Sequence, residues 1–213
     1  MSQNPRRALI VIDVQNEYVS GALPIEYPPV AQSLQRIGAA IDAARAAGVP
    51  VILVQHDAPA ASPVFAVGSP GWQLHEVVAG RPHEHLIRKT QASAFAGTDL
   101  QDWLAARGID TLAVAGYMTH NCDASTVVQA AHLGLKVEFL ADASGALPYE
   151  NEAGRASAEE IHRIYSVVFH TGFAAVQRTE DWIAALREGR PSAVGNIVES
   201  NQRARRSQGA SPR

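Results

Sequence analysis

The sequence contains one cysteine, no long hydrophobic run and no surplus of positive charge. One cysteine cannot form a disulfide within the chain. The apolar run 8–12 ends at Asp13 and is too short for a signal peptide or a membrane-spanning helix, so we expect neither. We therefore expect the protein in the cytoplasm. A net charge of -3 and a pI near 6.2 give no electrostatic reason to bind nucleic acid or an anionic membrane. We therefore expect a small-molecule partner.

Motifs that hold phosphate groups are also missing. No Gly-x-Gly-x-x-Gly follows the first apolar run, and the sequence has no P-loop. A non-catalytic nucleotide-binding module would need such a feature, so this alternative requires positive evidence, such as saturable binding of a nucleotide.

Apolar runs alternate with helical patterns along the chain, whose 213 residues suit one domain. Strands are predicted at 8–14, 51–55, 85–88, 111–115, 136–140 and 173–176, and helices at 30–47, 98–107, 123–132, 157–165 and 180–187. The helix at 98 is predicted from a capping-box pattern in residues 98–101. This alternation predicts an α/β doubly wound, mainly parallel sheet covered by helices on both faces.

Two segments depart from this alternation. Residues 57–80 lose periodicity and contain prolines and glycines, which predicts a long loop of functional importance. We place the domain at residues 1–188 and interpret residues 189–213 as a basic, mobile tail, with Arg203, Arg205, Arg206 and Arg213 among its charges. The alternative is that residues 197–206 pack on a partner subunit.

Three chemically reactive side chains follow three predicted strands: Asp13, Lys89 and Cys122. The carboxyl ends of parallel strands share one edge of a sheet, so we expect these side chains to meet there. Lys89 and the N-terminus of the following helix would favour the Cys122 thiolate, while Asp13 could take the thiol proton and pass it to a leaving amine. Backbone N–H groups in the turn 117–122 could stabilise an oxyanion. The pattern indicates acyl transfer.

The segments around these residues resemble a known family. Residues 10–18 (IVIDVQNEY), 89–95 (KTQASAF) and 116–122 (GYMTHNC) are similar to the three signature segments of the isochorismatase-like cysteine hydrolase superfamily. The similarity covers residues 8–185, with the segments in the family's order.

The resemblance implies a Rossmann-like three-layer α/β/α sandwich, so that 1–188 would be an isochorismatase-like hydrolase domain. It matches Asp13, Lys89 and Cys122 to the family's catalytic triad. It also implies a cis peptide between Tyr117 and Met118 and an oxyanion hole made by the N–H groups of Met118 and Cys122. Family members are commonly homo-oligomers, so we expect a dimer or tetramer.

Further residues are candidates for contact with the substrate. Asn16 and Tyr18 match family positions that touch substrate, Tyr117 and Thr119 flank the nucleophile, and Phe65, Trp72 and Phe95 are aromatic candidates for a pocket wall. His120 is close to Cys122 in sequence, but a turn can direct it outward, and we assign it no role.

The expected site contains no metal and no cofactor. Nicotinamidases of this superfamily bind a metal through an Asp-x-His pair, whereas the matching residues 55–59 read QHDAP. His75, His83 and His85 remain, but their spacing does not fit a metal site well.

The retained cysteine favours a covalent mechanism. We expect hydrolysis of a C–N bond in an amide, ureido compound or lactam through an acyl-enzyme, and the sequence does not select among ureidoacrylate, biuret, streptothricin and maleamate-type amide substrates. The alternative is an isochorismatase-type vinyl-ether hydrolase in which Asp13 acts as the acid and Cys122 is a spectator.

Overall fold

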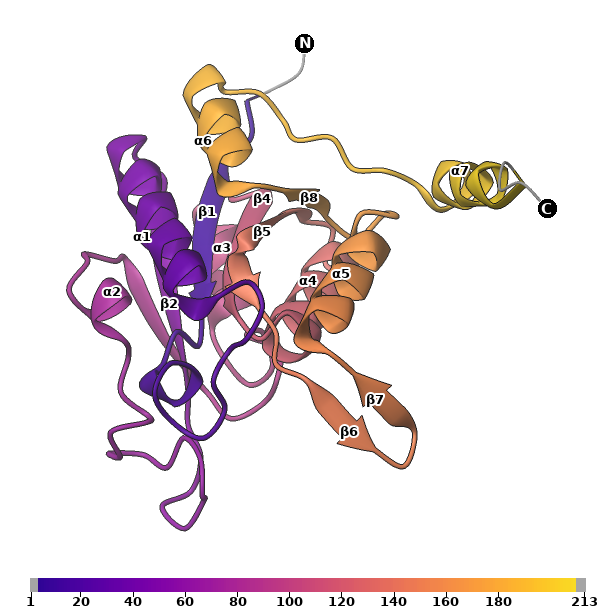
Figure 1. Cartoon of the computed structure of the whole chain (residues 1–213). Coiled ribbons are helices and arrows are strands. Elements are labelled where there is room, and N and C mark those ends of the chain that lie inside the picture. The colour runs from indigo at the N-terminus through magenta and orange to yellow at the C-terminus, as the bar shows by residue number, and fades with distance from the viewer. Residues whose placement is uncertain (1–3, 210–213) are drawn as a thin grey trace.

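The computed structural model describes residues 4–209 and contains a six-stranded sheet in the order β3-β2-β1-β4-β5-β8 (Figure 1). The strands are β1 (Arg7–Ile12), β2 (Val51–His56), β3 (His85–Lys89), β4 (Thr111–Tyr117), β5 (Lys136–Gly145) and β8 (Ala175–Gln177). Every neighbouring pair is parallel. The carboxyl ends of all six strands therefore lie at one edge of the sheet, as predicted.

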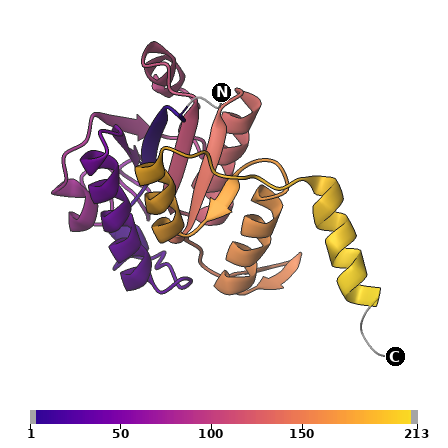
Figure 2. The ribbon, with the colours of Figure 1, turned by 90° about the horizontal axis from the view of Figure 1, so that it is seen from above.

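Helices cover both faces of the sheet (Figure 2). They are α1 (Val30–Ala46), α2 (Glu76–Ala79), α3 (Leu100–Ala106), α4 (Ala124–His132), α5 (Ala158–Phe169), α6 (Thr179–Glu188) and α7 (Ile197–Gly209). Helices α1 and α6 pack on one face, and α3, α4 and α5 pack on the other. This arrangement confirms the predicted α/β/α sandwich.

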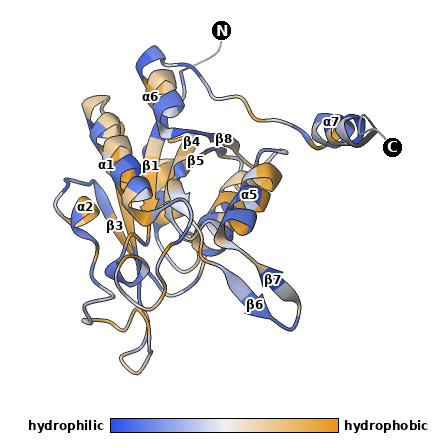
Figure 3. Ribbon diagram, in the orientation of Figure 1, coloured by the Kyte–Doolittle hydropathy of each residue, from blue (hydrophilic) through white to orange (hydrophobic). Residues whose placement is uncertain are grey.

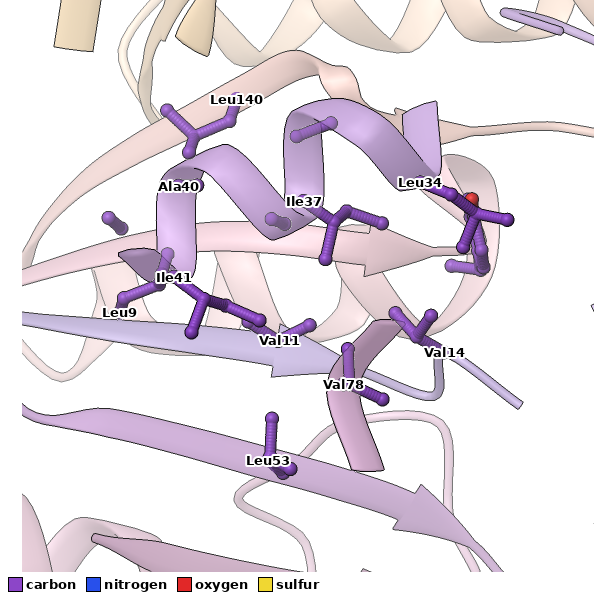
Figure 4. Close-up of a cluster of buried hydrophobic side chains, with 14 of the residues drawn as sticks. Leu9, Val11, Val14, Leu34, Ile37, Ala40, Ile41, Leu53, Val78 and Leu140 are labelled. Carbon is purple, nitrogen blue, oxygen red and sulfur yellow. The ribbon is translucent and has the colours of Figure 1, made fainter. Parts of the chain in front are cut away.

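The central strand β1 is buried on both faces because its residues alternate between two cores. Leu9 and Val11 contribute to the core under α1, while Ile10 and Ile12 contribute to the core on the opposite side. Figure 4 shows side chains of α1 lying over Leu9 and Val11 of β1. The hydrophobic colours in Figure 3 are accordingly concentrated on the sheet and on α1.

Several local predictions need correction. Asp99, and not Thr98, is the N-cap of α3, which begins at Leu100. The Thr98 hydroxyl donates to the Ala94 carbonyl at 2.6 Å and accepts from Leu100 N–H at 3.3 Å, not from Gln101 N–H, so the predicted capping box does not form. The segment 57–80 is not entirely loop, because it contains α2.

A β-hairpin and a C-terminal helix are among the elements that were not predicted. A two-stranded antiparallel hairpin of β6 (Tyr149–Asn151) and β7 (Gly154–Ala156) stands beyond the sheet, and α7 lies within the segment predicted to be a mobile tail. Arg213 lies outside the described residues. Within residues 4–209, no helix has the length and apolar composition that crossing a membrane requires.

Candidate active site

The structure brings the three predicted reactive side chains together. Lys89 Nζ lies 2.7 Å from Asp13 Oδ2 and 3.3 Å from Cys122 Sγ. Asp13 is 0%, Lys89 2% and Cys122 4% exposed, so the cluster is nearly shielded from water. A buried charge is costly unless it is paired, and here the ammonium has an anionic partner at contact distance.

Lys89 reaches this position from β3, across the end of β2. His56 is the ladder partner of Lys89 on β2, and its Nδ1 lies 3.3 Å from Lys89 Nζ. Lys89 also donates to the Gln91 carbonyl at 3.0 Å. Burial and the charge of Lys89 lower the pKa of His56, so the imidazole is neutral and Nδ1 can accept from the ammonium. His56 was not among the predicted site residues.

Burial and the neighbouring Asp13 keep the Cys122 thiol protonated in the resting protein. Burial lowers the pKa of Lys89, but Asp13 and Cys122 more than offset this effect, so the net shift is upward. Burial raises the pKa of Cys122 strongly, Asp13 raises it further, and Lys89 compensates only in part. Lys89 thus favours the thiolate, as expected, but burial and Asp13 outweigh it, so the Cys122 thiol is protonated in the resting protein. The effect of the helix N-terminus on the thiol stays a prediction.

Strand β4 lies very close to the end of β1 just before the turn that carries Cys122. This Cys122 turn, Thr119–Asp123, is one turn of π-helix between β4 and α4. Before it, Gly116 pairs with Ile12 and has φ 119, and a Cβ there would lie 2.1 Å from the Ile12 carbonyl oxygen, so only glycine allows β4 to pass so close to β1. Asp13 follows Ile12 directly, so the close pairing holds the start of the Cys122 turn near Asp13.

The backbone before Cys122 matches the expected geometry. The peptide between Tyr117 and Met118 is cis. The Met118 carbonyl accepts from Asn121 N–H at 3.0 Å and from Asp123 N–H at 3.1 Å. Among the described residues, no acceptor is found for the Met118 N–H. An N–H group in this state is suited to an oxyanion hole, which remains a prediction for Met118 and Cys122.

A second histidine anchors the Cys122 turn from α5. His162 Nδ1 lies 2.8 Å from Thr119 Oγ1. Burial lowers the pKa of His162 to about 4, so the ring is neutral at pH 7. A neutral imidazole has one N–H and one lone pair, so Nδ1 can pair with the Thr119 hydroxyl in either tautomer. Nothing in the sequence connects residues 119 and 162.

Tyr18 and Phe65, both predicted to contact substrate, form an aromatic group next to the cluster. Their ring centroids are 5.0 Å apart, and Phe65 lies 5.5 Å from the His56 ring. His56 contacts Lys89, so Phe65 and, next to it, Tyr18 border the cluster. Burial raises the pKa of Tyr18, and Cys122 and Asp13 raise it further. These two predicted residues are therefore at the site.

Five other predicted lining residues have partners elsewhere. The Tyr117 hydroxyl forms a hydrogen bond with Ser33 at 2.7 Å inside the core, and the Thr119 hydroxyl pairs with His162. Phe95 belongs to the core beside α3. Trp72 Nε1 donates to Asp57 at 2.8 Å, and Asn16 Nδ2 donates to the Pro70 carbonyl at 3.3 Å. Their hydrogen bonds and packing support the structure around the site, and direct contact with substrate remains a prediction for them.

Two residues near the rim were not predicted. Tyr149 of β6 is 45% exposed, and burial and Cys122 raise the pKa of its hydroxyl. His120 packs edge-on against Tyr149 at 4.9 Å, and burial lowers the pKa of His120 to about 4. The hairpin therefore contacts the Cys122 turn through the packing of Tyr149 on His120.

The three histidines considered as metal ligands do not converge. His75 Nδ1 accepts from Val77 N–H at the start of α2, and His83 Nδ1 lies 3.2 Å from the Arg81 carbonyl oxygen. His85 Nε2 lies 2.9 Å from Asp99 Oδ1. Each of them therefore has its own partner away from Cys122.

Comparison with known proteins identifies the family. The model of the Isochorismatase domain matches residues 7–181. The chain belongs to the isochorismatase family. The resemblance found in the sequence is thereby confirmed, and the parallel sheet described above is the isochorismatase-type fold.

The relatives in this family differ in their reactions. A streptothricin hydrolase of Streptomyces noursei is 42% identical over 138 residues, which are 64% of this chain and 49% of that enzyme. A ureidoacrylate amidohydrolase of Methylobacterium radiotolerans is 30% identical over 211 residues, covering 84% of this chain and 78% of the relative. The match to the streptothricin hydrolase thus spans about half the length of that relative.

A solved structure is much more similar. The isochorismatase-like protein of Burkholderia xenovorans LB400 shares 63% sequence identity and aligns with a TM-score of 0.96, covering 98% of this chain and 100% of the other. The tail segment is thus included in the similarity.

Proposed function

We propose that this isochorismatase-family hydrolase cleaves a C–N bond of a small amide, ureido compound or lactam through an acyl-enzyme on Cys122. The observation that supports this proposal most strongly is the position of Lys89 Nζ, in contact with both Asp13 and Cys122. A carboxylate, an ammonium and a thiol at one point provide a base, a charge stabiliser and a nucleophile. Relatives named as a streptothricin hydrolase and an amidohydrolase are consistent with it.

In the first half-reaction, the Cys122 thiol gives its proton to Asp13 as sulfur attacks the carbonyl carbon. Transfer must accompany attack, because the raised pKa of Cys122 keeps the thiol protonated at rest. Lys89 stabilises the negative charge on sulfur while it forms, and the N–H groups of Met118 and Cys122 stabilise the carbonyl oxygen. Protonated Asp13 then donates to the leaving nitrogen, the C–N bond breaks and an amine or ammonia leaves.

In the second half-reaction, water replaces the leaving amine. The oxygen of water attacks the thioester carbon while Asp13 takes a proton from that water, and the C–S bond then breaks. The proton returns to sulfur, which restores the Cys122 thiol and the Asp13 carboxylate. The sum is one amide and one water converted into one acid and one amine. Tyr18 and Phe65 are the side chains that we assign to the pocket wall.

The test is a Cys122→Ala variant assayed with a panel of small amides, ureas and lactams for release of ammonia or amine. The variant should lose turnover while keeping its circular dichroism spectrum, and mass spectrometry of the unmodified enzyme with a slow substrate should show an acyl adduct on Cys122. An alanine variant that still turns over would contradict covalent catalysis.

One observation favours a second candidate. A buried thiol with a raised pKa is a poor nucleophile, which fits a vinyl-ether hydrolase in which Asp13 protonates the substrate and Cys122 is a spectator. Alkylation by iodoacetamide discriminates between the two. If the protein is the amide hydrolase, alkylation should inactivate it in proportion to the labelling of Cys122. If it is the vinyl-ether hydrolase, the thiol is not needed, and Cys122→Ala should remain active.

A further inference from the structure

Helix α7 stands apart from the rest of the molecule in both views (Figures 1 and 2). Its first two residues, Ile197 and Val198, are 71% and 63% exposed. Among the described side chains, the hydrogen bonds of α7 up to Ser207 and of its capping residue Asn196 stay within 196–207. The described part of the helix thus exposes apolar side chains and makes no side-chain hydrogen bond with the rest of residues 4–207.

An isolated helix of this kind has little stability of its own. α7 has 13 residues, and helices of this length are marginal in water unless a tertiary contact stabilises them. Its second half is basic, with Arg203, Arg205 and Arg206 all exposed. A suitable partner would offer an apolar patch followed by acidic groups.

The outer face of α5 has these properties. Ile164, Val167 and Val168 are 49%, 60% and 46% exposed, and their spacing places them on one side of the helix. One to two turns toward the start of α5, Glu159 and Glu160 are exposed. The apolar and acidic parts of α5 are thus complementary to the apolar and basic parts of α7.

The spacing along the two helices also agrees. Val198 and Arg205 are seven residues apart on α7, and Glu160 and Val167 are seven residues apart on α5. Seven residues are about 10.5 Å along a helix and return to nearly the same face. If the helices run antiparallel with Val198 on Val167, Arg205 meets Glu160.

From this match we infer that α7 docks on α5 of a second copy of this chain, and that the second copy returns the same contact. The linker passes the C-terminal end of the chain's own α5, where Gly195 lies against the C-cap residue His170, and α7 then stands apart from that helix in both views (Figures 1 and 2). Ser192 is held by Glu138 and Gln177 at 2.8 and 2.9 Å, and Asn196 caps the new helix by accepting from Glu199 N–H at 2.9 Å. A two-fold exchange doubles a contact that would be small by itself.

The mass in solution tests this exchange. Deletion of residues 197–213 should halve the mass measured by light scattering after size-exclusion chromatography, and Val167→Asp should do the same while keeping its circular dichroism spectrum. Val67→Asp is the matched control, because Val67 is 49% exposed on a loop away from α5 and its substitution should leave the mass unchanged. A deletion variant with the same number of subunits as the full chain would overturn the inference.

Cross-linking identifies which chain supplies the helix. In a Cys122→Ala background, a variant carrying Val167→Cys and Val198→Cys should form a product of two-chain mass with a short bis-maleimide reagent. A variant carrying Val67→Cys and Val198→Cys should not. A product of one-chain mass would show that α7 folds onto its own α5, and absence of any 167–198 product would show that α7 binds elsewhere; both results would refute the exchange.

Discussion

The hydroxyl of Thr119 lies 2.8 Å from Nδ1 of His162, and this bond joins the Cys122 turn to α5. Both residues are buried, so the bond is shielded from water. Because the Cys122 turn carries the thiol and the N–H groups proposed for the oxyanion hole, its position depends on this contact from a helix that contributes no reacting group. His162 is thus a positioning residue in the proposed mechanism.

Thr119→Val should reduce kcat by about tenfold or more while changing KM little. A small displacement of the reacting groups lowers the rate of the chemical step more than it weakens substrate binding. The variant keeps the side-chain volume and leaves His162 Nδ1 unpaired, which should also lower the free energy of unfolding by about 1–3 kcal/mol. Steady-state kinetics and urea unfolding measure the two effects. Ser33→Ala removes a different buried hydroxyl partner, that of Tyr117, and is the control. Equal losses of kcat in both variants would indicate general destabilisation.

Lys89→Met should abolish activity and destabilise the fold by about 3–5 kcal/mol, because it leaves the buried Asp13 carboxylate without its partner. Asp13→Asn should nearly abolish activity as well. The variant with both substitutions should be more stable than Lys89→Met alone, since no unpaired charge remains, although it should stay inactive. Urea unfolding of all four proteins in a double-mutant cycle measures this coupling. Additive losses of stability would show that the pair is not coupled.

The parallel sheet and the meeting of Asp13, Lys89 and Cys122 were predictable because both follow from local patterns. Apolar runs mark the strands, and a residue just after a parallel strand must lie at the carboxyl edge. The state of Cys122 was not predictable in this way. Its pKa depends on how completely the folded chain buries it and on the distance to Asp13, and neither quantity is present in the sequence.

The elements that escaped prediction have weak local signals. The strand β6 has three exposed residues and no alternation of apolar and polar side chains. In α7 the apolar residues Ile197 and Val198 occur only at the start, so no helical period is visible. His162 escaped because its partner Thr119 is 43 positions away and the link depends on how α5 packs.

Asp123 should make the protein less stable as the pH rises from about 4 to 8. Burial, with a further contribution from Asp13, raises the pKa of Asp123 from 3.8 to about 8, so the folded chain holds a proton that the unfolded chain releases at lower pH. Where the folded state binds more protons, the free energy of unfolding falls with increasing pH. This loss should begin near pH 4 and level off above pH 8.

Asp123→Asn isolates this effect because asparagine does not ionise. Relative to the unmodified protein, the variant should gain stability steadily between pH 5 and pH 8, as measured by urea unfolding at fixed ionic strength. Glu152→Gln, which removes an exposed carboxylate between β6 and β7, is the control and should show no such gain over this range. A difference between Asp123→Asn and the unmodified protein that does not change with pH would contradict the assignment.

Chelators should leave the activity unchanged, because the groups that a metal would need already have other partners. The lone pair of His56 Nδ1 faces Lys89 Nζ at 3.3 Å, and the same ammonium pairs with Asp13 at 2.7 Å. A cation at this point would have to displace Lys89, whose charge already stabilises the sulfur and the carboxylate. Activity after dialysis against EDTA and against 1,10-phenanthroline is the measurement, with total metal content determined on the same samples. Loss of activity that zinc or iron restores would show that a metal takes part, and Lys89 would then have to leave Asp13 during the reaction.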